Sequence, residues 1–196
     1  MARKIRSNRK KENYYRAWKY LKESRIYFWI IAALFLISIL IGVIFPVFFQ
    51  EFIKQLIENL AEKTKGMGFF QLFVFILQNN VMTAFLGLLL GLILGLLPLL
   101  LVLFNGYVLG FISGKVAGVE GSGILLRLLP HGIFEIPALI ISLGLGLKLG
   151  MFVFSKKPGK QLAYDLENSL RVFLFVIIPL LLIAGLIEAG LIFILG

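Results

Sequence analysis

Long apolar runs separated by short polar or glycine-rich breaks dominate the pattern of this chain. The first run is YFWIIAALFLISILIGVIFPVFF at 27–49, and the last is VFLFVIIPLLLIAGLIEAGLIFIL at 172–195. Each reaches the roughly 20 residues that an α-helix needs to cross the hydrocarbon core of a membrane. The pattern therefore predicts helices that span a membrane at both of these positions.

The apolar stretch from 69 to about 118 is too long to be one span. Fifty helical residues would measure about 75 Å, more than twice the roughly 30 Å of the bilayer core. The polar triplet at 78–80 and the turn-like Gly95-Leu96-Leu97-Pro98 are the natural breaks, and Asn105-Gly106 offers a third. The breaks predict spans at 80–97 and 98–117, with 69–78 as a short helix that enters or skirts the membrane.

A fourth span is predicted at 124–154, with Pro130 and Pro137 inside it, and a polar loop at 155–171 separates it from the fifth. Between the first two spans, apolar residues of 50–65 recur at helical spacing opposite a charged face. Such a helix is expected to lie along the membrane surface. The predicted fold class is an all-α polytopic membrane helix bundle of about five transmembrane helices, some broken or kinked.

Composition and charge support this class and orient it. Hydrophobic residues make up 60% of the chain and charged residues 15%, against about 45–50% and 25% in soluble domains. Ten Lys and Arg residues precede the first span, so the positive-inside rule predicts a cytoplasmic N-terminus. We expect a basic cytoplasmic arm at 1–26, which contacts membrane lipids and not nucleic acid, and a single transmembrane domain at 27–196 in the cell membrane.

Glycines recur every fourth residue on two predicted neighbouring spans. Such spacing allows helix backbones to approach closely in lipid, where association depends on packing rather than on burial from water. We expect the two rows to form a tight hairpin between spans two and three. The predicted packing glycines are Gly87, Gly91 and Gly95 in one row, and Gly106, Gly110, Gly114 and Gly118 in the other.

Polar and ionisable side chains inside the spans are the candidate functional residues. A charge at the centre of a membrane helix costs at least about 2.5–3.5 kcal/mol on insertion scales, so such residues usually face protein or water. Glu135 shares a helix face with His131, the only histidine, because four residues separate them. The predicted buried polar centre consists of Asn79, Asn80, Asn105, His131, Glu135 and Glu188.

Three interpretations of this centre stay open at the level of sequence. It can fix the helices through hydrogen bonds, it can relay protons or ions in a transporter, or it can bind a divalent metal through His131, Glu135 and Glu188. The HExxH pair of metalloproteases is absent, and the chain has no cysteine. Enzymatic activity is therefore disfavoured, and no cofactor is expected apart from the alternative of a metal at His131 and Glu135.

Three segments together resemble the stage II sporulation protein M family. They are QNNVMTAFLGLLLG (78–91), FNGYVLGFISG (104–114) and LLPHGIFEIPALIIS (128–142), followed by Glu188 in the last span. The resemblance implies a five-span scaffold, which in spore-forming bacteria assembles with bitopic partners that degrade peptidoglycan during engulfment.

We therefore expect a non-enzymatic membrane scaffold that organises other membrane proteins, or copies of itself, through its helices. The first alternative is a small ion- or proton-coupled transporter or permease-like component that uses the Glu/His/Asn centre. The second is an intramembrane metal-binding protein.

Overall fold

The computed structural model describes residues 2–120 and 125–195, with side chains at 11–115 and 132–194. This described part is helical and contains no strand. Its elements are, in chain order, α1 (Ala2–Glu23), α2 (Arg25–Ile44), α3 (Gln50–Thr64), α4 (Phe69–Leu89), η1 (Leu90–Leu92), α5 (Leu96–Glu120), α6 (Leu125–Gly150), η3 (Met151–Phe154), α7 (Pro158–Val172), η4 (Phe173–Ile177) and α8 (Ile178–Leu195).

Five helical segments of the described chain are long and apolar enough to cross a membrane. They cover Arg25–Ile44, Phe69–Leu92, Leu96–Lys115, Gly132–Phe154 and Pro158–Ile194. The predicted all-α fold with five such helices is therefore confirmed. Both the side of the membrane that holds the N-terminus and the division into an arm and one membrane domain stay predictions.

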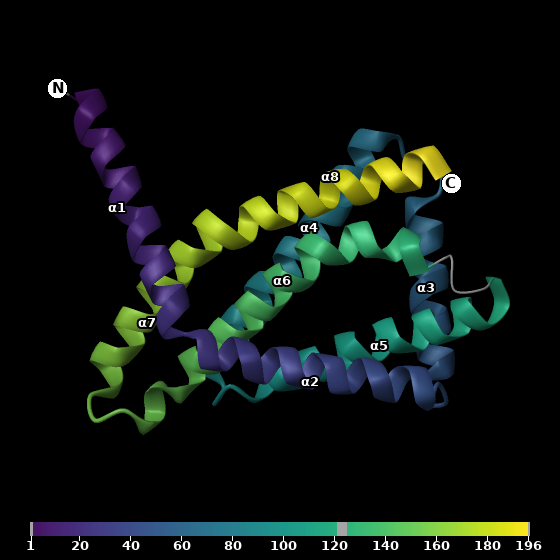
Figure 1. Ribbon diagram of the computed structural model, residues 1–196, viewed down its shortest axis with the longest axis horizontal. Helices are drawn as coiled ribbons and strands as arrows, with labels where there is room; N and C mark the ends of the chain where they lie inside the picture. The colour runs from purple at the N-terminus through teal and green to yellow at the C-terminus, as the bar shows by residue number, and fades with distance from the viewer. Residues whose placement is uncertain (1, 121–124, 196) are drawn as a thin grey trace.

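The helices form two groups that share α6. Helix α2 lies alongside α5, whereas α4, α6 and α8 pack against one another, and α6 also contacts α2 and α5 (Figure 1). The N-terminal part of α1 extends away from both groups, whereas its C-terminal part lies against α7, and α3 crosses the far end of α2 and α5 (Figure 1). Figure 1 also shows that α6 bends, as expected from Pro137 near its middle.

The predicted break at 78–80 is wrong, because α4 runs without interruption from Phe69 to Leu89. The segment 69–78 is thus the first half of a membrane helix and not a separate short one. A polar triplet can remain helical in a membrane when its side chains find partners, and Asn80 donates a hydrogen bond to Glu135. Helix α5 likewise continues through Asn105-Gly106.

The turn between α4 and α5 comes earlier than predicted. The chain tightens through η1 and turns at Leu94 and Gly95, which have φ angles of 52° and 69°. Glycine adopts this left-handed conformation without steric cost. Pro98 lies in the first turn of α5, where a missing N–H breaks no helical hydrogen bond.

The first predicted span and the predicted loop at 155–171 also differ from the structure. Helix α2 ends at Ile44 rather than 49, because Pro46 disfavours a helical conformation for the residue before it. The predicted loop at 155–171 is largely wrong, since Pro158–Val172 forms α7 with proline in its first turn. Helix α3 follows the predicted surface helix at 50–65 almost residue for residue, although its position relative to a membrane stays a prediction.

The two glycine rows do allow close backbone contacts, but with other helices than predicted. A Cβ added at Gly110 would collide with the carbonyl oxygen of Ile39 in α2, and one at Gly91 with that of Gly146 in α6. The rows therefore join α5 to α2 and α4 to α6, and the predicted hairpin packing of one row on the other is wrong. Gly118 lies outside the residues whose side-chain surroundings are described.

Candidate functional site: a polar cavity between membrane helices

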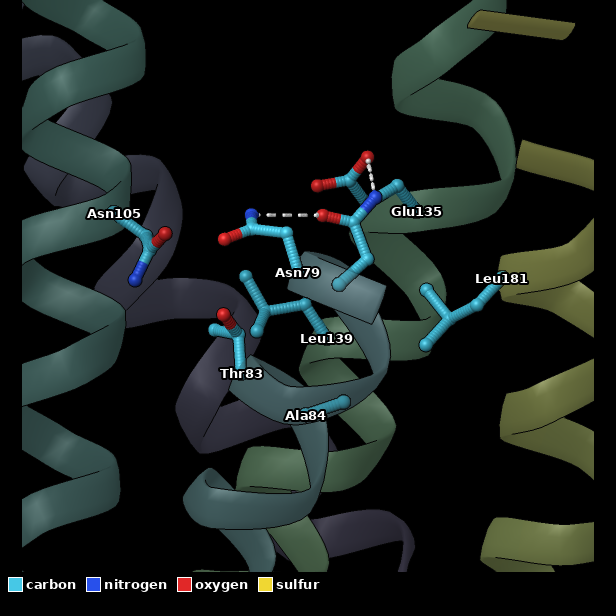
Figure 2. A pocket seen from close by; sticks show the side chains of 8 residues that line it. Asn79, Thr83, Ala84, Asn105, Glu135, Leu139 and Leu181 are labelled. Atoms are coloured by element: carbon cyan, nitrogen blue, oxygen red, sulfur yellow. Dashed lines mark hydrogen bonds between the residues drawn. The ribbon is translucent and has the colours of Figure 1, made fainter. Parts of the chain in front are cut away.

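A cavity of about 70 Å³ lies between α4, α5, α6 and α8. This volume exceeds the roughly 10–15 Å³ that a cavity needs to hold a water molecule, so the space is large enough for water. Its lining combines polar side chains with three apolar ones (Figure 2): Asn79, Asn80, Thr83, Ala84, Asn105, Glu135, Leu139 and Leu181. We call this space the Asn80–Glu135 cavity.

A chain of amide hydrogen bonds leads from α4 to the carboxylate of α6. Asn79 Nδ2 donates to Asn80 Oδ1 at 3.4 Å, and Asn80 Nδ2 donates to Glu135 Oε2 at 2.9 Å. On the other side of the cavity, Asn105 Nδ2 donates to the carbonyl oxygen of Leu101 at 2.8 Å within α5. Each asparagine thus directs an N–H group toward a protein acceptor.

The structure brings together four of the six residues of the predicted polar centre. Asn79, Asn80, Asn105 and Glu135 line the cavity. Glu188, half-buried on α8, is not among the described residues of this lining. The side chain of His131 lies outside the described residues, so its pairing with Glu135 stays a prediction. Thr83 joins the lining from one turn beyond Asn79, a spacing that could have revealed it in the sequence.

A metal site at His131, Glu135 and Glu188 also stays a prediction. Within 11–115 and 132–194, no three His, Cys, Asp or Glu side chains lie close enough to hold a metal ion together. That range omits His131, which the predicted site requires.

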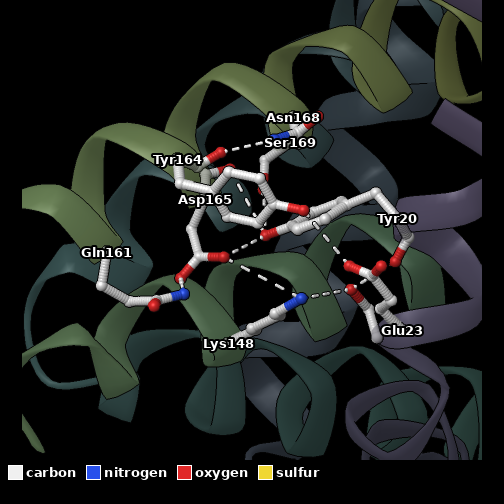
Figure 3. A network of polar contacts seen from close by, with 9 residues as sticks. Tyr20, Glu23, Lys148, Gln161, Tyr164, Asp165, Asn168 and Ser169 are labelled. Atoms are coloured by element: carbon white, nitrogen blue, oxygen red, sulfur yellow. Dashed lines mark hydrogen bonds and ion pairs between the residues drawn. The ribbon is translucent and has the colours of Figure 1, made fainter. Parts of the chain in front are cut away.

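A second polar cluster joins the arm helix α1 to α2, α6 and α7 (Figure 3). We call it the Tyr20 cluster; it consists of Tyr20, Ser24, Lys148, Asp165 and Ser169. Tyr20 Oη donates to Asp165 Oδ1 at 2.8 Å, and Asp165 is only 2% exposed. Burial raises the pKa of Tyr20 above its usual range, so its hydroxyl remains a proton donor.

Lys148 stands at the centre of the Tyr20 cluster. Its Nζ atom donates to Ser24 Oγ at 2.9 Å, lies 3.9 Å from Asp165 Oδ1 and sits 3.8 Å from the centroid of the Tyr20 ring. A cation placed over an aromatic ring gains a further electrostatic attraction, which is larger when the ring is desolvated. The cluster therefore attaches α1 to the membrane helices through the hydrogen bond from Tyr20 to Asp165 and the cation–π contact of Lys148 with Tyr20, and the ion pair between Lys148 and Asp165 joins α6 to α7.

Sequence reasoning missed the Tyr20 cluster because its members are far apart in the chain. Apart from Lys148 in the predicted fourth span, they also lie in segments interpreted as an arm and a loop. A signal was present in α7. Its buried residues Asp165, Asn168, Ser169 and Val172 follow the spacing of one helix face. Asp165 and Ser169 of this face contact Tyr20, so the face is polar where it meets α1.

These features define a class: a polytopic membrane protein whose spans line a carboxylate-containing polar pocket and carry an attached basic helix. Within that class, residues 31–191 match the family model of stage II sporulation protein M. Because the match covers most of the chain, the protein belongs to this family. No curated protein and no solved structure gave a significant match.

Proposed function

We propose that the protein is an integral membrane scaffold that organises partner proteins through its membrane helices and its basic arm. The observation that carries this proposal is the Tyr20 cluster. It holds α1 against α6 and α7 with buried polar contacts, so that a charged helix leaves the bundle in one defined direction (Figure 1). A scaffold needs such a fixed surface, whereas a flexible tail would serve for electrostatic attachment to lipid alone.

The tight helix pairs support the same proposal. Ser38 in α2 donates to the carbonyl oxygen of Leu103 in α5, and Ser142 in α6 donates to that of Ala84 in α4 at 2.5 Å. These bonds lie in the same two helix pairs as the close glycine contacts. Interfaces built from backbone contact change shape little, since no flexible side chain separates the helices. Stiff pairs suit a protein that presents surfaces to partners.

Aromatic side chains on the arm are the expected points of contact. Tyr15 and Trp18 are 71% and 60% exposed, although they neighbour the buried Ala17 and Tyr20 on the same helix. Tyrosine and tryptophan are enriched in protein interfaces because they supply large contact areas with few rotatable bonds. They also anchor proteins at the membrane surface, so a test must separate partners from lipid.

Photo-crosslinking in native membranes makes this separation. A photoreactive residue in place of Tyr15 or Trp18 should yield discrete protein adducts, whereas the same residue in place of Leu36, an exposed side chain in the apolar helix α2, should yield lipid adducts. Protein adducts are to be identified by mass spectrometry. If the arm positions give only lipid adducts, as Leu36 is expected to, the arm is not a docking surface and this part of the proposal fails.

One observation favours a second function, ion- or proton-coupled transport. The Asn80–Glu135 cavity lies near the middle of α4, a segment long enough to cross the membrane, and it contains a carboxylate. Intramembrane carboxylates commonly mark ion and proton pathways. Transport predicts that Glu135→Gln abolishes a flux in proteoliposomes while the protein still folds. No flux in the wild type would remove this candidate.

A further inference from the structure

The side chain of Gln78 is exposed near the middle of a membrane helix. It belongs to the 24-residue span Phe69–Leu92, and polar side chains of other spans, such as Ser38 and Ser142, are buried instead. Gln78 is not part of the lining of the Asn80–Glu135 cavity. Within the described part of the chain, its amide group has no hydrogen-bond partner. An exposed, unpaired amide at this position therefore requires an explanation.

Gln78 lies on the face of α4 that is turned away from the bundle. Two residues correspond to about 200° around a helix, so Gln78 is nearly opposite Ile76, which is 7% exposed and packs with Ala189 of α8. Met82, one turn beyond Gln78, is 58% exposed, and Leu86, a further turn on, is 43% exposed. We call Gln78, Met82 and Leu86 the outer face of α4.

The depth of Gln78 in the span makes contact with lipid unfavourable. It lies nine residues after Phe69 and fourteen before Leu92, which is about 14 Å and about 21 Å along the helix. Hydrocarbon offers no hydrogen bond to an amide, and an unsatisfied polar group there is costly. Amide side chains in membrane spans accordingly bind to neighbouring helices. The outer face of α4 thus needs a partner with a donor and an acceptor at this depth.

A second copy of the chain supplies both groups. The amide of glutamine donates through Nε2 and accepts through Oε1, so two glutamines can satisfy each other with two hydrogen bonds. Two copies have the same orientation in the bilayer. The axis of a closed pair therefore runs along the membrane normal, and each contacting residue meets its own counterpart at equal depth. Met82 has the flexible side chain that adapts to such a surface.

We propose that two copies of the chain associate through the outer faces of α4, with the amides of the two Gln78 residues hydrogen-bonded to each other. This inference goes beyond the proposed scaffold, because it concerns a surface on α4 and not the arm. A partner protein can dock on α1 of a monomer as well as of a dimer. The failure of either proposal therefore leaves the other standing.

Photo-crosslinking from Met82 in native membranes tests which occupant covers the outer face. A photoreactive residue at this position should give an adduct of twice the 22.0 kDa of one chain, with the link in α4 of the second copy. The same residue in place of Leu36, which is 61% exposed on α2, should give lipid adducts. Adducts of Met82 with lipid alone, or with a different protein, would overturn the proposal.

Two variants of the outer face test the role of the amide. Association of full-length copies carrying different fluorophores is to be followed by energy transfer during dilution in detergent. Gln78→Leu should raise the dissociation constant of the dimer roughly tenfold, because two hydrogen bonds between helices are lost. Met82→Leu changes an apolar neighbour of similar volume and should leave the constant close to that of the wild type.

The contradicting results are equally specific. A wild type that stays monomeric at every concentration would overturn the proposal, and so would equal dissociation constants for the wild type and Gln78→Leu. Thermal unfolding of the monomers controls for the fold. Gln78→Leu should unfold at the temperature of the wild type, because the amide has no partner within the described chain. A lowered midpoint would place Gln78 inside the bundle and also contradict the proposal.

Discussion

Gly110→Ala should be strongly destabilised, whereas Gly114→Ala should be about as stable as the wild type. An added Cβ at Gly110 would overlap the carbonyl oxygen of Ile39, a backbone atom of α2 that no rotamer change can move. At Gly114 the nearest atom is Val43 Cα at 3.4 Å, an ordinary van der Waals distance. The two glycines lie one turn apart on α5 and face the same helix, so they form a closely matched pair.

The expected difference in unfolding free energy follows from the cost of separating two helices. Overpacking a core costs about 1–3 kcal/mol and occasionally more. Because Gly110 meets backbone, we expect about 3 kcal/mol for Gly110→Ala and under about 0.5 kcal/mol for Gly114→Ala. Unfolding in a denaturing detergent measures the two differences in unfolding free energy. The fraction of each variant recovered as a monodisperse species after extraction gives a second comparison. Equal stability of the two variants would mean that α2 and α5 are not in backbone contact.

Asp165→Ala should release the arm helix α1 from the bundle. The change removes the hydrogen-bond acceptor of Tyr20 and leaves Lys148, whose side chain is 13% exposed, without its carboxylate partner. Removing one partner of a buried ion pair costs about 3–5 kcal/mol. Limited digestion with trypsin, which cleaves after Lys19 and Lys22 in α1, should become faster than in the wild type.

Glu167→Ala is the matched control for this change. Glu167 lies on the same helix and pairs with Arg171 at 2.6 Å, but its side chain is 65% exposed. Exposed pairs contribute only about 0–1 kcal/mol, so digestion of α1 should stay at the wild-type rate. The double variant Asp165→Ala, Lys148→Met should recover part of the loss, since it removes the unpaired charge as well. Equal digestion rates of Asp165→Ala and Glu167→Ala would show that the Tyr20 cluster does not hold α1.

The sequence predicted the number and type of the membrane helices because apolar length is a local property. Runs such as 27–49 and 172–195 need no tertiary information to be interpreted as spans. The bounds of the second helix could not be predicted in this way. The triplet at 78–80 remains helical because Glu135, 55 residues away in sequence, accepts a hydrogen bond from Asn80.

The candidate site was predictable in part for the same reason. Asn80, Asn105 and Glu135 stand out as polar residues in apolar surroundings, and they do line one cavity. The partner helices of the glycine rows were not predictable, because equal spacing fits any neighbouring helix. In the Tyr20 cluster, Tyr20 and Ser24 contact residues 124 to 149 positions away in the chain, such as Lys148 for Ser24 and Ser169 for Tyr20.

The mass of the native assembly tests the proposed scaffold most directly. The protein is to be extracted in polymer-bounded discs of its own membrane and its complexes weighed by native mass spectrometry. The scaffold predicts a particle in which the 22.0 kDa chain is joined at fixed stoichiometry by another membrane protein or by further copies of itself. The Asp165→Ala variant should lose a partner that docks on the arm. A single copy that catalyses ion flux in proteoliposomes would contradict the scaffold and establish a transporter instead.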